Sequence, residues 1–183
     1  LELRREGSFS GQNIERIEVD TFDVAFNIIG GGEEGDKTVV RTKEEADHSL
    51  PYMIAAAVLD GNVGPKQYLP ARIRKADVQS LLRKVIIRPN NEFSRLFPDA
   101  LPCNVSVRLR GGRILMKDKR DYEGFFTRPL SWKKVVEKFS SLCPPAADKR
   151  LRGRIVDAVA ELEEVGTADL MKLLGKIALK KEG

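Results

Sequence analysis

The pattern of residues 105–117 most limits what this chain can fold into. Apolar and polar side chains alternate from Val105 to Arg110, and a period of two is typical of a strand that buries one face. Gly111 and Gly112 then suit a tight turn, and the segment 113–117 returns as a second strand. This region predicts an antiparallel β-hairpin, so the fold must contain a sheet.

Two further strands and several helical pieces are expected before the hairpin. Residues 14–22 alternate in polarity from Ile17 onward and predict a half-buried strand, and residues 85–88 predict another. Short helices are expected at 70–74 and 76–84. Residues 1–125 are therefore interpreted as a small mixed α+β domain.

Two successive helix starts are the strongest local signals in that domain. Thr42 and Glu45 have the spacing of a capping box, which predicts a short helix that ends near residue 48. Ser49 can cap a second helix, and Pro51 fits the first turn of that helix, where its missing N–H costs nothing. This second helix should end before Gly61.

The remaining residues, 126–183, predict helices alone. Ser131 is expected to cap a helix over 132–142, and Thr167 another that continues toward residue 177. Between them, residues 148–163 form an amphipathic pattern. Its apolar face is expected to contain Leu151, Ile155, Val159 and Leu162. The predicted fold class is therefore α+β, with a helical C-terminal segment whose apolar faces need a partner surface.

The composition is that of an ordinary globular protein, but the charge is unevenly distributed. The chain has 183 residues, of which 42% are hydrophobic and 32% charged, and a formal net charge of +5. Residues 1–60 are acidic, whereas residues 61–127 are basic. The basic section is compatible with a solvated surface or with attraction for phosphate or carboxylate groups.

One hypothesis makes the basic section a nucleic-acid-binding module. The residues that would serve it are Arg108, Arg110, Arg113, Lys117, Lys119 and Arg120. The hairpin lacks the interleaved exposed aromatic side chains that base stacking requires, so no nucleic-acid partner is expected.

The cysteines, the single histidine and the apolar runs exclude several other classes. Cys103 and Cys143 stand far apart, and with one His in the chain a zinc site is not expected. Lone cysteines fit a reducing cytoplasm. The longest apolar run, 53–59, is far shorter than the roughly 20 residues of a membrane span. The N-terminus has no signal-peptide layout, and it resembles the middle of a helix, which suggests a fragment of a longer chain.

His48, Ser49 and Tyr52 are the best local candidates for a functional site. His48 lies at the junction of the two predicted helices, and a helix N-terminus at Ser49 could attract a carboxylate through its unpaired N–H groups. Tyr52 could reach the same place as a hydrogen-bond donor, acid or base, although its ordinary pKa of about 10 would need adjustment for a base. Alternatively, Ser49 only caps the helix, Pro51 only starts it and Tyr52 only packs. Both interpretations remain open at this level.

Arg128 is a separate candidate in the segment that joins the two sections. Residues 121–132 combine aromatic side chains, a glycine, an arginine and a helix start. The forked guanidinium of Arg128 could bind a carboxylate of a substrate, or it could fix the linker to a neighbouring acidic side chain.

Several of these segments together resemble the MmgE/PrpD family, which includes 2-methylcitrate dehydratase, cis-aconitate decarboxylase and iminodisuccinate epimerase. The resemblance is strongest at Ala46–Tyr52 and continues through Ala55–Gly61. It then follows in order through 73–85, the hairpin 105–115, 124–131 and the tail around 162–174. It covers nearly the whole chain.

The resemblance implies a fold in which an α+β lid is inserted into a large helical domain. Residues 1–125 would be the lid, and residues 126–183 would be helices of the all-helical domain. The active site of the family lies between these domains, and part of it, including a Lys and a His, would precede Leu1. Tyr52 and His48 then match the catalytic part of the family motif. Ser49 and Arg128 match positions expected to bind substrate.

The resemblance also implies a lyase that needs no cofactor or metal. A base removes a proton beside a carboxylate, and an acid assists the departure of a hydroxyl group as water. The expected reaction is dehydration of 2-methylcitrate to 2-methyl-cis-aconitate in propionate metabolism, by a cytoplasmic homodimer. Decarboxylation or epimerisation of a related di- or tricarboxylate is the alternative. A non-catalytic fragment that dimerises through its tail helices is a third possibility. The 183-residue chain alone is expected to be inactive.

Overall fold

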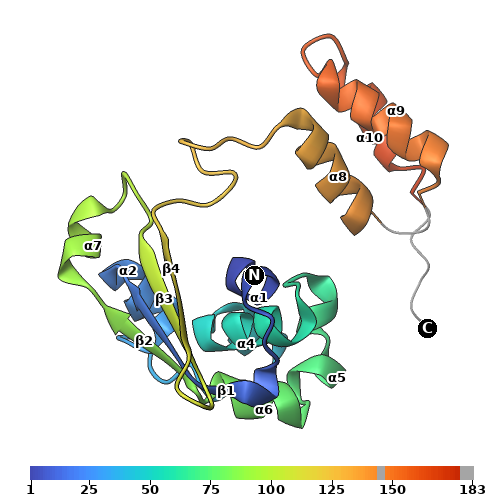
Figure 1. Ribbon diagram of the computed structural model, residues 1–183. Helices are drawn as coiled ribbons and strands as arrows, with labels where there is room; N and C mark the ends of the chain where they lie inside the picture. Colours follow the sequence, from blue (N-terminus) through green and yellow to red (C-terminus); the bar gives the residue numbers. More distant parts are fainter. Residues whose placement is uncertain (144–146, 178–183) are drawn as a thin grey trace. The chain divides into compact units, whose positions relative to one another are not determined.

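The chain folds into two units, each of which is described by itself. The structure, a computed structural model, describes residues 1–143 and 147–177 (Figure 1). The first unit is Leu1–Tyr122 and the second is Glu123–Gly183. The fold combines helices with a sheet and ends in helices, which confirms the predicted α+β class. The assignment of these parts to a lid and to a helical domain stays a prediction.

A four-stranded mixed sheet forms the framework of the first unit (Figure 1). Its order is β2-β1-β3-β4. The strands are β1 (Ile14–Thr21), β2 (Val85–Pro89), β3 (Cys103–Leu109) and β4 (Ile114–Lys119). β1 pairs in parallel with β2 and antiparallel with β3, and β3 and β4 form the predicted hairpin. Gly111 and Gly112 have φ angles of 92° and 88°, which a residue with a side chain adopts only with strain, so the tight turn depends on glycine.

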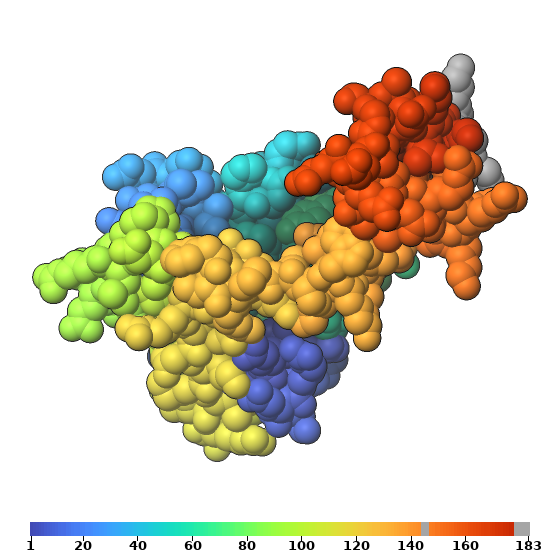
Figure 2. Space-filling view, turned by 90° about the horizontal axis from the view of Figure 1, so that it is seen from above, coloured from blue at the N-terminus to red at the C-terminus, as the bar shows by residue number. Residues whose placement is uncertain are grey.

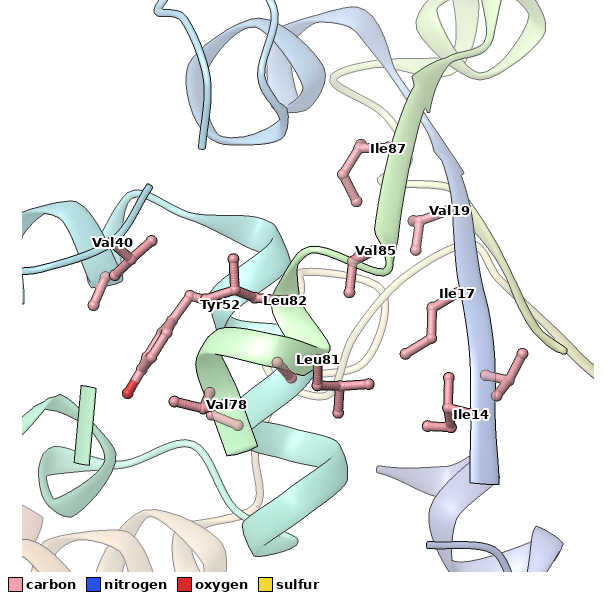
Figure 3. Packing of buried hydrophobic residues seen from close by; sticks show 14 of the residues in the cluster. Ile14, Ile17, Val19, Val40, Tyr52, Val78, Leu81, Leu82, Val85 and Ile87 are labelled. Atoms are coloured by element: carbon pink, nitrogen blue, oxygen red, sulfur yellow. The ribbon is translucent and has the colours of Figure 1, made fainter. Parts of the chain in front are cut away.

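Helices pack against the sheet and share its core. α4 (Leu50–Asp60) and α6 (Ala76–Leu82) contact each other, and α4 also contacts β2. Strand residues that alternate in the sequence, such as Ile17, Val19 and Val107, lie in one apolar cluster with Ala55 and Leu82. Figure 3 shows the β1 and β2 side chains directed toward α6 and α4. The period-two pattern of the sequence therefore identified the buried face of the sheet.

Short helical elements complete the first unit. They are α1 (Glu2–Gly7), η1 (Gly11–Asn13), α2 (Asp23–Ala25), η2 (Phe26–Gly30), α3 (Lys43–Asp47), η3 (Pro65–Tyr68), α5 (Pro70–Ile73) and α7 (Asn91–Leu96). The sequence patterns predicted α3, α5 and α6 but not α2, η2 or α7. α1 lies beside β4, and Figure 2 shows the blue N-terminal residues against the yellow hairpin. There Glu6 binds Lys117 at 3.0 Å and Glu2 binds Lys119 at 2.8 Å. Two of the six basic side chains considered for nucleic-acid binding are therefore paired with carboxylates.

The second unit contains the three predicted tail helices, with three corrections, one of which is that the last helix ends at Leu174 and not near residue 177. These are α8 (Trp132–Leu142), α9 (Lys149–Ala160) and α10 (Thr167–Leu174). Ser131 caps α8 as expected. The prediction that Thr167 caps α10 is wrong: Gly166 is the N-cap, because its carbonyl accepts the first helical hydrogen bond, from Leu170 N–H, and Thr167 is the first helical residue.

The apolar face predicted for residues 148–163 is shorter than expected. α9 ends at Ala160, so Leu162 lies outside the helix and is 53% exposed, and Val159 is 39% exposed. Ile155 is buried with Ala158 and Leu173, and Leu151 packs against them. Only the first half of the predicted face therefore contributes to the core of this unit.

Candidate functional site

The candidate site lies at the N-termini of two successive helices of the first unit, α3 and α4. Thr42 Oγ1 accepts a hydrogen bond from Glu45 N–H at 3.2 Å, and Glu45 Oε2 accepts one from Thr42 N–H at 3.0 Å. This reciprocal pair is the predicted capping box, and it fixes the first turn of α3. α3 then ends at Asp47, with His48 as its C-cap, and α4 begins directly after Ser49. We call the segment Asp47–Tyr52 the α3–α4 corner.

His48 forms a close pair with the carboxylate beside it. Its Nδ1 lies 2.6 Å from Asp47 Oδ1 and 3.1 Å from the Glu44 carbonyl oxygen. Both are acceptors, so Nδ1 carries a proton, and Nε2 is the nitrogen that can take up or release one. The side chain is 63% exposed. The hydrogen bond to Asp47 raises the pKa of His48, because the carboxylate favours the protonated imidazole.

The Asp47–His48 pair leads to a direct prediction on proton binding. His48 is the only histidine, so one imidazole Cε1 NMR signal reports its titration. We expect its pKa to lie above the ordinary value of about 6.5, and Asp47→Asn to lower it toward that value. The stabilisation from this pair is complete below the unfolded-state pKa and is lost as the pH rises through the folded-state pKa. A Glu44→Gln variant, which keeps the backbone carbonyl, is the control and should leave the titration unchanged. An unshifted titration in the unsubstituted chain would contradict the pairing.

Ser49 is fully buried, and its hydroxyl group both accepts and donates a hydrogen bond. Ser49 Oγ accepts a hydrogen bond from Tyr52 N–H at 3.1 Å and donates one to the Lys37 carbonyl oxygen at 2.5 Å. The serine therefore caps α4 and ties residue 37 to it. Because Pro51 has no N–H and that of Tyr52 is bound to Ser49, these two residues offer no unpaired N–H group to a carboxylate. Substrate binding by Ser49 stays a prediction.

Tyr52 lies in the first turn of α4, and its side chain is fully buried. Its hydroxyl donates a hydrogen bond to the Gln67 carbonyl oxygen, and its ring centroid lies 6.1 Å from that of Tyr68. Figure 3 shows the phenol pointing away from β1. Burial raises the pKa of Tyr52, although the positive charge of Arg72 opposes this effect. The phenol therefore stays protonated at neutral pH, which disfavours a role as base. Its full burial and its bond to a backbone carbonyl agree with the alternative that Tyr52 packs, so a catalytic role stays a prediction.

The sequence patterns missed three residues that a chain of hydrogen bonds connects to the Tyr52 hydroxyl, Gln67, Asp60 and Arg72. Gln67 supplies the carbonyl that accepts its proton, and Asp60 receives hydrogen bonds from the side chains of both Gln67 and Arg72. The sequence placed Asp60 only at the end of the second predicted helix, before Gly61. No local pattern could have linked it to Arg72, because the two residues meet only after the chain has turned back through η3.

Arg128 belongs to the second unit, between β4 and α8. Its backbone closes a tight turn: Arg128 N–H donates to the Phe125 carbonyl oxygen, and the Arg128 carbonyl accepts from Gly124 N–H, both at 2.8 Å. The other three predicted site residues, His48, Ser49 and Tyr52, lie in the α3–α4 corner. The imidazole of His48 is exposed, whereas the side chains of Ser49 and Tyr52 are buried. A role for Arg128 in substrate binding stays a prediction.

One cavity of the first unit lies apart from the predicted site residues. A cavity of about 450 Å³ opens beside α6, where Asp77, Lys84 and Arg110 line it with five other residues, and it includes none of the predicted site residues. Within residues 1–143 and 147–177, no cluster of three or more His, Cys, Asp or Glu side chains could hold a metal ion. In the same ranges, none of the helices combines the length and apolar character needed to cross a bilayer.

Comparison with known proteins places these features in a family. Residues 1–164 match the sequence model of the MmgE/PrpD C-terminal domain. Cis-aconitate decarboxylase of Mus musculus is 24% identical over 170 residues, which are 92% of this chain and 33% of that protein. Cis-aconitate decarboxylase of Homo sapiens is 26% identical over 139 residues, 74% of this chain and 28% of that protein. The chain spans about a third of the length of these two relatives.

Proposed function

We propose that this chain, which belongs to the MmgE/PrpD family, is the C-terminal part of a lyase that acts on a small tricarboxylate. The observation that carries the proposal is the family match over residues 1–164, which contains the whole α3–α4 corner. The first reaction that we propose is dehydration of 2-methylcitrate to 2-methyl-cis-aconitate. We propose no cofactor for it, because proton transfer and charge stabilisation suffice for this chemistry.

The α3–α4 corner supplies groups suited to such a reaction. In a dehydration, a base removes the proton beside a carboxylate, and the C–O bond breaks as an acid protonates the departing hydroxyl group. Tyr52 is a phenol that stays protonated at neutral pH, and His48 is an imidazole whose pKa is raised by the hydrogen bond to Asp47. We assign Tyr52 as the proton donor and His48 as a second proton-transfer group. Ser49 and Arg128 are proposed to contact the substrate.

Decarboxylation of cis-aconitate is the second candidate reaction. The observation that favours it is that both relatives described above are cis-aconitate decarboxylases. In that reaction the carbon–carboxylate bond breaks with loss of CO₂, and a proton donor supplies a proton to the electron pair left behind. The same phenol could therefore serve either reaction.

The test is an assay of the complete polypeptide that contains this chain, with each substrate in turn. We expect 2-methylcitrate to yield a conjugated alkene, followed by ultraviolet absorbance, and treatment with EDTA to leave the rate unchanged. Release of CO₂ from cis-aconitate without dehydration of 2-methylcitrate would instead assign the second reaction. Turnover of neither substrate would overturn the proposal. The 183-residue chain alone is the matched control and is expected to be inactive.

A further inference from the structure

A charged hydrogen-bond network follows directly after α4. The Arg72 guanidinium binds Asp60 in a forked arrangement, with Nε 2.8 Å from Oδ2 and Nη2 2.9 Å from Oδ1. Arg72 also donates to Asp77 at 2.8 Å. Only 12% of the Arg72 side chain and 21% of that of Asp60 are exposed. Forked pairs of this kind hold a planar geometry more strictly than single contacts between flexible side chains.

Gln67 connects this network to Tyr52. Its side-chain Nε2 donates to Asp60 Oδ2 at 3.0 Å, and its Oε1 accepts from Gly64 N–H at 3.1 Å. The backbone carbonyl of the same residue accepts the Tyr52 hydroxyl proton. Both ends of the Gln67 side-chain amide are thus hydrogen-bonded, while the backbone carbonyl of Gln67 is bound to the phenol.

The connection runs along the length of α4. Tyr52 lies in the first turn of this helix and Asp60 is its last residue. After the left-handed Gly61, the chain returns and places η3 so that Gln67 reaches both of them. A substitution of the Gln67 side chain removes its contacts with Asp60 and Gly64 without removing any group that touches the phenol.

We propose that Gln67 and Asp60 are positioning residues for Tyr52: together they fix η3 over the phenol, which sets the direction of its hydroxyl group and restricts its contact with water. The part of this inference that concerns catalysis rests on the proposed function, in which Tyr52 meets the substrate. The part that concerns geometry does not, because it depends only on contacts within the first unit.

The geometric part is tested by exchange of the Tyr52 hydroxyl proton. Tyrosines labelled with ¹³C at Cζ show separate signals for O–H and O–D forms when this exchange is slow, and Tyr52→Phe identifies the signal among the three tyrosines. We expect Gln67→Met, which keeps the side-chain volume but removes both hydrogen bonds, to accelerate exchange roughly tenfold, as the loss of one hydrogen bond to a charged group implies. Gln79→Met is the matched control, because the Gln79 side chain also makes two hydrogen bonds, which it donates to the carbonyls of Val40 and Ile73.

The outcomes separate the two parts of the inference. Unchanged exchange in a folded Gln67→Met chain would overturn it. If that variant does not fold, Asp60→Asn weakens the hydrogen bond between Asp60 and Gln67 from its other end and is expected to accelerate exchange as well. Unchanged exchange in Asp60→Asn would also overturn the inference.

In the complete polypeptide, Gln67→Met should lower kcat more than it changes KM, and it should add no further loss in a Tyr52→Phe background. An additive loss would mean that Gln67 acts on the fold in general. If Tyr52→Phe leaves kcat unchanged, the assigned role of Tyr52 is wrong, while the exchange result still decides the geometry.

Discussion

Replacement of Ile17 by alanine is expected to destabilise the first unit by about 2–5 kcal/mol, the usual effect of removing a large buried aliphatic side chain. Ile17 is fully buried in β1, which pairs with strands on both sides. It lies opposite Val85 in β2 and Val107 in β3, and all three side chains belong to the same buried apolar cluster. The lost contacts and the remaining cavity therefore both contribute to the free energy of unfolding.

The matched control is the same substitution at Ile86. This residue lies in β2 and is 36% exposed, and its neighbours Val85 and Ile87 are the buried residues of that strand. Ile86→Ala is expected to cost less than about 1 kcal/mol, because less apolar surface leaves contact with the protein. Urea unfolding should be followed by NMR signals of β1 and β3 amides, so that the second unit does not contribute. Equal losses for both variants would contradict the assignment of the buried face of the sheet.

The elements that the sequence predicted are those encoded by neighbouring residues. The capping box at Thr42, the cap at Ser49 and the turn at Gly111 each depend on hydrogen bonds or φ angles within a few residues, and the structure contains all three. The alternation along β1 similarly reports which side chains are buried. Local physical chemistry suffices for these features.

The features that the sequence did not predict depend on contacts between distant residues. The parallel pairing of β1 with β2 joins Ile17 to Val85 across the whole helical crossover, and no periodicity specifies a partner strand. α7 follows β2 as six residues capped by Asn90, too short for a helical period to be recognised. Thr167 was assigned as a cap because its residue type suits one, yet Gly166 at the end of the preceding turn takes that position.

The candidate site likewise combines features that neighbouring residues encode with features that depend on contacts between distant residues. The sequence identified Ser49 as a helix cap and Tyr52 as a residue of the first turn, and both positions are confirmed. It left open whether Tyr52 packs or reaches a ligand. The observed burial and the hydrogen bond to Gln67 come from a segment 15 residues further along the chain, whose path depends on how η3 and α5 fold back on α4. The role of Tyr52 in catalysis stays a prediction that only activity can test.

Replacement of Tyr52 by phenylalanine in the complete polypeptide is expected to lower kcat about 100-fold or more, the range reported for the loss of a general acid. The change removes one oxygen atom and the proton that the proposed reaction requires. It leaves the ring in its apolar surroundings. The Gln67 carbonyl loses one partner, so a cost of only about 1 kcal/mol in folding free energy is expected. The measurement is kcat with 2-methylcitrate and with cis-aconitate, together with a urea titration of each variant.

Tyr68→Phe is the matched control for the loss of kcat expected in Tyr52→Phe. The Tyr68 ring lies beside that of Tyr52, and burial raises the pKa of its hydroxyl as well, so the two residues share much of their environment. Tyr68→Phe is expected to leave kcat close to that of the unsubstituted protein. A large loss for Tyr52→Phe alone would show that the reaction needs the hydroxyl in the first turn of α4. Equal losses for both variants would show that the reaction depends on the packing of the two rings, and no loss for Tyr52→Phe would exclude the phenol as proton donor. Because the 2-methylcitrate and cis-aconitate reactions need a proton at different atoms, a loss confined to one substrate would also show which of them the phenol serves.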